Sequence, residues 1–88
     1  MSCVDRIAAY IFKQPPIRRL ALYLYIVKEM SPSEIEATTG VTRNAVRGMV
    51  QRLYEKCNSR QLALKVAKKI LEEMDYGQLL EVGSHAKE

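Results

Sequence analysis

The sequence of 88 residues has little of what metal sites and enzyme active sites need. It contains a single histidine, His85, and two cysteines, Cys3 and Cys57, that lie far apart and form no CxxC pair. This set is too small for a zinc site, so we expect no metal, no other cofactor, and two reduced thiols in structural roles. No candidate nucleophile has a neighbouring base to activate it, which makes an enzyme the weakest functional hypothesis. We therefore predict no catalytic residues.

The chain also lacks a long hydrophobic run. The longest, residues 20–27, covers eight residues, whereas a helix that crosses a bilayer needs roughly twenty. Asp5 and Arg6 interrupt the apolar residues near the N-terminus, where a secretory signal needs an unbroken hydrophobic block. We expect a cytoplasmic protein without membrane contact, and no small-molecule ligand is evident.

The length limits the architecture to one domain, because multidomain enzymes and doubly wound nucleotide-binding folds need longer chains. A chain of this size buries about 60 % of its unfolded surface. Its apolar residues, which make up 48 % of the sequence, must therefore pack efficiently. The net charge of +4 permits an anionic partner without requiring one. We place residues 1–77 in one helical domain and residues 78–88 in a flexible C-terminal tail.

Helix start and stop signals divide the chain into segments. Pro16 suits the first turn of a helix, and Ser31 with Glu34 three residues later forms a capping box at the start of another. Gly40 offers the left-handed conformation that ends a helix, and Thr42 caps the helix that follows. Between these signals, apolar residues recur with helical period. We predict a compact, all-α, four-helix domain with helical segments near residues 3–13, 16–30, 32–39, 43–57 and 60–75, the short segment 32–39 being the first of a pair.

Residues 31–53 resemble the helix-turn-helix of bacterial and archaeal DNA-binding domains, and the likeness covers about a quarter of the chain firmly. In that pattern an apolar residue precedes a glycine by five places, and an apolar residue, a Ser or Thr cap and two apolar anchors follow. This sequence supplies Ile35, Gly40, Val41, Thr42, Val46 and Met49 in those places. One position departs from the pattern, since Glu36 stands where family members usually have Ala. The resemblance implies that the groove-facing residues are Thr42, Arg43, Asn44, Arg47 and Gly48.

The second helix of the pair also suits DNA by its own chemistry. Arg43 and Arg47 are one turn apart and Gln51 is one turn further, so guanidinium and amide groups line one stripe that can pair with guanine or adenine edges. Arg52 and Lys56 flank the stripe and suit phosphates. Residues 42–57 carry four basic side chains and one acidic side chain, which accounts for most of the net charge. The alternative is an amphipathic helix with a solvated basic face.

Gly48 lies in the middle of this helix, where glycine costs about 1 kcal/mol relative to alanine. The missing side chain allows close approach of another group. Either a nucleic-acid backbone or a neighbouring helix could use that space, and the sequence leaves both explanations open.

Many domains with such a pair carry a β-hairpin wing after the second helix. A wing here would need two alternating strands and a turn within residues 58–74. The helical period at Ile70, Leu71 and Met74 and the absence of a turn signal favour a wingless form.

We therefore predict sequence-dependent binding of double-stranded DNA through residues 42–57, by a small transcriptional regulator. The alternative is a helical protein-interaction module, or an accessory subunit of a DNA-processing or transcription complex, that uses the same pair without reading bases. The apolar stripe of residues 60–75 predicts a homodimer through this fourth helix, and a dimer would double the DNA footprint.

Overall fold

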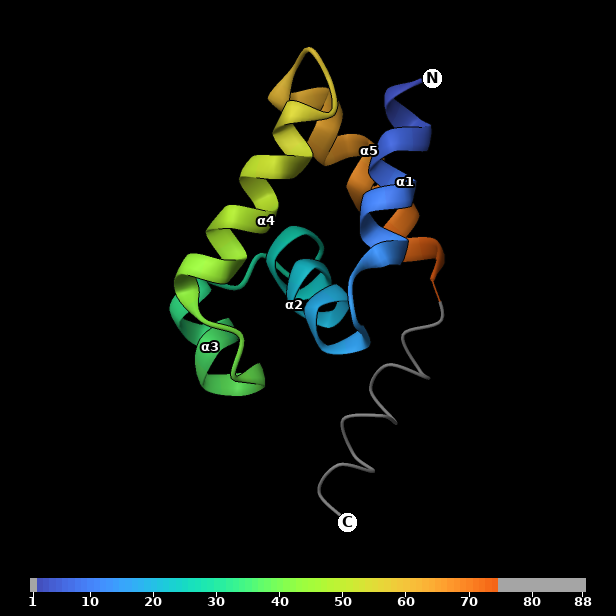
Figure 1. Ribbon diagram of the computed structural model, residues 1–88. Coiled ribbons are helices and arrows are strands. Elements are labelled where there is room, and N and C mark those ends of the chain that lie inside the picture. The colour runs from blue at the N-terminus through green and yellow to red at the C-terminus, as the bar shows by residue number, and fades with distance from the viewer. Residues whose placement is uncertain (1, 75–88) are drawn as a thin grey trace.

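The computed structural model describes residues 2–74 and confirms the all-α class. These residues contain no strand and five helices: α1 (Cys3–Lys13), α2 (Pro16–Ile26), α3 (Pro32–Thr39), α4 (Arg43–Glu55) and α5 (Arg60–Glu73) (Figure 1). The described residues form five helices rather than four, because the short segment 32–39 forms a separate helix of eight residues. The expected absence of a hairpin within residues 58–74 agrees with the structure, since residues 60–73 form α5. The expected tail lies outside the described residues.

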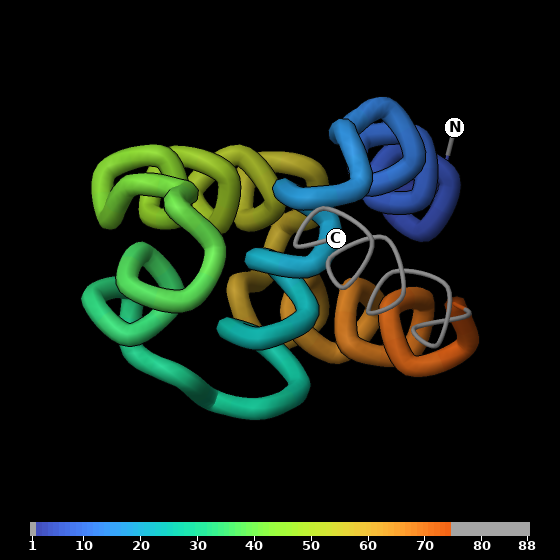
Figure 2. The backbone as a smooth tube through the Cα atoms, turned by 90° about the horizontal axis from the view of Figure 1, so that it is seen from below, coloured from blue at the N-terminus to red at the C-terminus, as the bar shows by residue number. Residues whose placement is uncertain are grey.

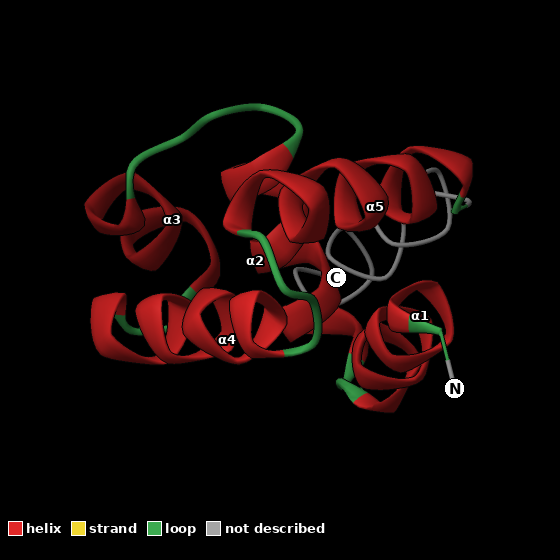
Figure 3. Cartoon of the chain, turned by 90° about the horizontal axis from the view of Figure 1, so that it is seen from above, coloured by secondary structure: helices red, strands yellow, loops and turns green. Residues whose placement is uncertain are grey.

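The helices form two layers around α2. α1 and α4 lie on one side of the molecule, α3 and α5 lie on the other, and α2 passes between them (Figure 2) (Figure 3). α5 packs against α1, α2 and α4. Every helix contributes buried apolar side chains to a single core, whose largest fully buried members are Ile7, Ile11, Leu22, Ile35, Met49, Leu53 and Leu71.

The end of α2 differs from the prediction. α2 ends at Ile26 rather than near residue 30. Glu29 adopts a left-handed backbone with φ 57°, and the N–H of Met30 donates to the carbonyl of Leu24 at 3.0 Å, which turns the chain toward α3. Such a turn is usually marked by glycine, and its absence here left the helical pattern without a stop signal.

Replacing Glu29 with glycine should raise the free energy of unfolding by about 1 kcal/mol. A side chain in the left-handed conformation costs about 1–2 kcal/mol, which the larger entropy loss of glycine offsets in part. Urea denaturation of Glu29→Gly measures the gain. Glu29→Ala is the control, because it removes the carboxylate and keeps the Cβ atom, and it should change stability little. A glycine variant less stable than the alanine variant would contradict this explanation.

Cys3 and Cys57 form a disulfide, so the prediction of two reduced thiols was wrong. The bond joins the first residue of α1 to the loop after α4, with the Cα atoms 5.2 Å apart across a sequence separation of 54. The sequence shows that the two cysteines are too few for a metal site, but it gives no information on the distance between them in the folded chain. Their pairing could therefore not be predicted. The disulfide holds the N-terminal end of α1 beside the C-terminal end of α4.

Candidate nucleic-acid interface

Local hydrogen bonds set the start and end of the two helices that contain the predicted site. The hydroxyl of Ser31 accepts from the N–H of Glu34 at 3.2 Å, and the Glu34 carboxylate accepts from the N–H of Ser31 at 3.4 Å, which completes the capping box of α3. α3 ends at Gly40, whose φ is 80°. The hydroxyl of Thr42 then accepts from the N–H of Ala45 at 3.1 Å and caps α4. The capping box, Gly40 and Thr42 all act where the sequence predicted them.

Apolar anchors orient α4 on α3. The anchors of the pattern are all buried: Ile35 and Val46 are fully buried, Met49 is 2 % exposed and Val41 is 8 % exposed. Because one side of α4 faces the core, the opposite side faces solvent. That side carries seven of the eight predicted DNA-binding residues, namely Thr42, Arg43, Asn44, Arg47, Gly48, Gln51 and Arg52. The structure therefore brings these residues together on one accessible face.

Glu36, the residue that departs from the family pattern, contacts the start of α4. Its Oε1 accepts from the N–H of Arg43 at 3.1 Å and lies 3.5 Å from Nε of the same residue. A carboxylate at this position satisfies a free amide and is favoured by the helix dipole. The sequence pattern did not predict this role, although the seven-residue separation across the turn is compatible with it. The guanidinium group of Arg43 thus forms an ion pair with Glu36, whereas Arg47 has no ion-pair partner among residues 2–74.

Gly48 faces open space. A Cβ atom placed there would meet no heavy atom within 4 Å in the described part of the chain. Of the two explanations that the sequence left open, the close approach of a neighbouring helix thus finds no support within residues 2–74. The approach of an external partner to the surface of α4 stays a prediction.

Lys56 is the one predicted DNA-binding residue that is half-buried. Its Nζ lies 5.5 Å from the centroid of the Tyr10 ring on α1, which is a cation–π distance. Lys56 therefore lies at the boundary between α4 and α1, beyond the exposed stripe. It lines an open cleft there with residues of both helices.

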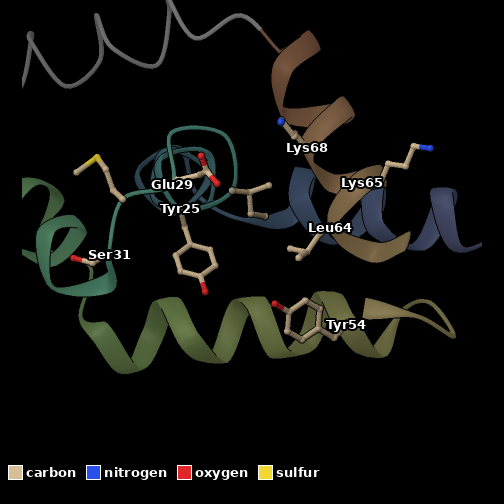
Figure 4. Close-up of a pocket in the computed structure, with 9 residues that line it drawn as sticks. Tyr25, Glu29, Ser31, Tyr54, Leu64, Lys65 and Lys68 are labelled. Carbon is tan, nitrogen blue, oxygen red and sulfur yellow. The ribbon is translucent and has the colours of Figure 1, made fainter. Parts of the chain in front are cut away.

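A second concavity lies on the other side of α4. It has a volume of about 610 Å³, and residues of α2, α4 and α5 line it, together with the segment that precedes α3 (Figure 4). The Tyr25 side chain points from α2 toward α4 in this view. Its walls are mostly apolar, with Lys65 and Lys68 on α5 and Glu29 after α2. The predicted DNA-binding residues do not line this groove.

Residues 2–74 offer neither a metal cluster nor a membrane-spanning helix. No group of three or more His, Cys, Asp or Glu side chains in this range could hold a metal ion. No helix in the same range is long and apolar enough to cross a membrane. The exposed face of α4 remains the candidate site.

Comparisons with protein-family models, with curated proteins and with solved structures found no match to this chain. The likeness to helix-turn-helix domains accordingly stays a prediction from the residues that carry it. The proposed function rests on the geometry and chemistry of α3 and α4.

Proposed function

We propose that the protein binds double-stranded DNA in a sequence-dependent manner, with α4 in the major groove as the recognition helix of a helix-turn-helix. The observation that carries this proposal is the exposed stripe formed by Arg43, Arg47 and Gln51, with Asn44 exposed beside it, on a helix braced by α3. A major groove about 12 Å wide admits an α-helix. Arginine pairs with the O6 and N7 atoms of guanine, and asparagine or glutamine pairs with the N6 and N7 atoms of adenine. The stripe thus presents the side chains that distinguish base pairs.

Electrostatics support the same assignment. Residues 42–57 carry Arg43, Arg47, Arg52 and Lys56 against Glu55. A basic helix attracts the phosphate backbone and raises the rate of encounter with DNA. Arg52 is exposed beside the stripe and suits a phosphate at the groove edge.

We propose that the protein acts in the cytoplasm as a small transcriptional regulator, since its ligand is duplex DNA. The Cys3–Cys57 disulfide limits the kinds of cell in which the protein can be cytoplasmic. Intracellular proteins of most mesophiles keep their thiols reduced, whereas those of hyperthermophilic archaea and bacteria are rich in disulfides. A cytoplasmic location therefore requires a cell that keeps this disulfide oxidised.

Selection from a pool of random-sequence duplexes tests binding and specificity together. The purified protein should enrich a short consensus that contains guanine or adenine at the positions read by Arg47 and Gln51. Failure to enrich any sequence, together with absence of duplex binding at low salt, would favour a protein-interaction module instead.

Replacing Gly48 with alanine should have opposite effects on stability and on binding. Alanine at an exposed position inside a helix stabilises by about 1 kcal/mol relative to glycine. Nothing in the described chain obstructs the new methyl group, so this gain should appear in full in urea denaturation. Duplex affinity should fall if the DNA backbone approaches α4 at Gly48. A more stable variant with unchanged duplex affinity would show that DNA does not come close at this position.

We propose that the protein forms a homodimer through α5. The apolar stripe that suggested this interface packs inside the chain, where Ala63, Ala67 and Leu71 are fully buried. A second copy would therefore contact the outer side of α5, where Leu62 is 46 % exposed. Sedimentation equilibrium at micromolar concentration should give twice the chain mass of 10.1 kDa, and a single chain mass would reject the dimer.

A further inference from the structure

The cleft between α1 and α4 gathers positive charge outside the base-reading stripe. It has a volume of about 460 Å³ and is lined by Arg6, Ala9, Tyr10, Lys13, Glu55 and Lys56. The four residues from α1 recur at helical spacing, so one face of that helix forms one wall. The end of α4 forms the other wall. Three cations and one carboxylate leave the cleft with a net positive charge.

The cations of the cleft form no ion pair within residues 2–74. The ion pair of the described residues joins Arg43 to Glu36, and neither Arg6, Lys13 nor Lys56 takes part in one within that range. Lys56 lies over the Tyr10 ring at 5.5 Å, a contact that positions the ammonium group and leaves its N–H donors free. Cations that line one cleft repel one another, and a bound anion relieves that repulsion. The cleft therefore suits an anionic group.

The cleft lies where the edge of a DNA groove would run. α1 and α4 occupy the same side of the molecule (Figure 2) (Figure 3). Lys56 follows Arg47 by nine residues, which at 1.5 Å per residue places it about 13.5 Å further along the helix direction. The major groove is about 12 Å wide. With Arg47 over the bases, the C-terminal end of α4 and the adjoining face of α1 reach the sugar-phosphate backbone.

We propose that this cleft binds a backbone phosphate of the same duplex whose bases α4 contacts, an inference that rests on the proposed function. Arg6 and Lys13 from α1 and Lys56 from α4 donate to the phosphate oxygens. These contacts carry no sequence information and set the position of α4 in the groove. The disulfide between Cys3 and Cys57 keeps the two walls together in the free protein, so the site is formed before DNA arrives.

The test compares two double variants with the same change in net charge. Arg6→Ala/Lys13→Ala alters the cleft, and Lys28→Ala/Lys68→Ala removes two exposed lysines that line neither the cleft nor the stripe. Fluorescence anisotropy between 50 and 200 mM salt, on a selected and an unrelated duplex, measures affinity and its salt dependence. The cleft variant should bind both duplexes on the order of 10-fold more weakly at low salt. The slope of log affinity against log salt should fall by about 0.9 for each phosphate that the variant no longer neutralises.

The control variant Lys28→Ala/Lys68→Ala should keep the slope of the native chain, and an equal loss of affinity in both double variants would overturn the proposal. Glu55→Gln makes the cleft more positive, because it removes the carboxylate of the cleft. It should increase both affinity and slope, and a decrease in either would contradict the proposal.

Inorganic phosphate distinguishes a free anion from DNA as the ligand. Loss of phosphate binding in Arg6→Ala/Lys13→Ala with unchanged duplex affinity would assign the cleft to free phosphate and overturn the proposal. If the native chain binds no duplex at low salt, the proposed function fails and this inference fails with it. If Arg47→Ala weakens duplex binding while the cleft variant keeps its slope, only the inference fails.

Discussion

The double variant Cys3→Ser/Cys57→Ser is expected to lose about 2–4 kcal/mol of folding free energy. The disulfide closes a loop across a sequence separation of 54, and this restriction of the unfolded chain is the larger part of the expected effect. For a domain of this size such a loss lowers the melting temperature by roughly 10 °C or more. Circular dichroism during heating measures the shift.

The variant should remain helical at low temperature, because Ile7 and Ile11 of α1 stay buried against the core. Reduction of the native chain with a phosphine is the matched control and should lower the melting temperature by a similar amount. The single variant Cys3→Ser should behave like the double variant. An unchanged melting temperature after complete reduction would show that the bond contributes nothing to stability.

Arg47→Ala is expected to reduce discrimination between the selected duplex and a duplex with one changed base pair by about 5- to 150-fold. This range corresponds to about 1–3 kcal/mol for a bidentate arginine–guanine contact. Arg47 is exposed and has no ion pair within residues 2–74, whereas Arg43 is shared with Glu36. Arg47 should therefore carry more of the sequence preference than Arg43. Competition binding with the two duplexes measures the discrimination.

Arg47→Lys separates base reading from charge, since lysine keeps the positive charge and lacks the planar fork of donors. It should retain affinity for unrelated duplexes and lose much of the discrimination. Lys28→Ala, in the turn after α2, is the control for a simple change in net charge and should leave discrimination unaltered. Equal discrimination in the native chain and in both Arg47 variants would exclude this residue from base recognition.

The helix pair could be predicted because its signals are local. The capping box of Ser31 and Glu34, the left-handed Gly40 and the cap at Thr42 each depend on residues within a few places of one another. The burial of Val46 and Met49 followed from helical period alone. For the same reason, the exposed face of α4 could be identified residue by residue before its structure was known.

Contacts between distant segments could not be predicted from these signals. Nothing in the sequence relates Cys3 to Cys57, because their proximity depends on how α1 packs beside α4. The contact of Lys56 with Tyr10 has the same origin, and it moves Lys56 from the flank of the stripe to the wall of a cleft. The turn at Glu29 escaped prediction because a residue other than glycine occupies the left-handed position.

Chemical-shift perturbation of the amide groups in isotope-labelled protein, on addition of the selected duplex at low salt, tests most directly whether DNA contacts the exposed face of α4. We expect the largest changes at residues 42–52, smaller changes at the α1 face around Lys13, and little change along the outer face of α5. Changes concentrated on α5, or no change at a molar excess of duplex, would contradict the proposed function.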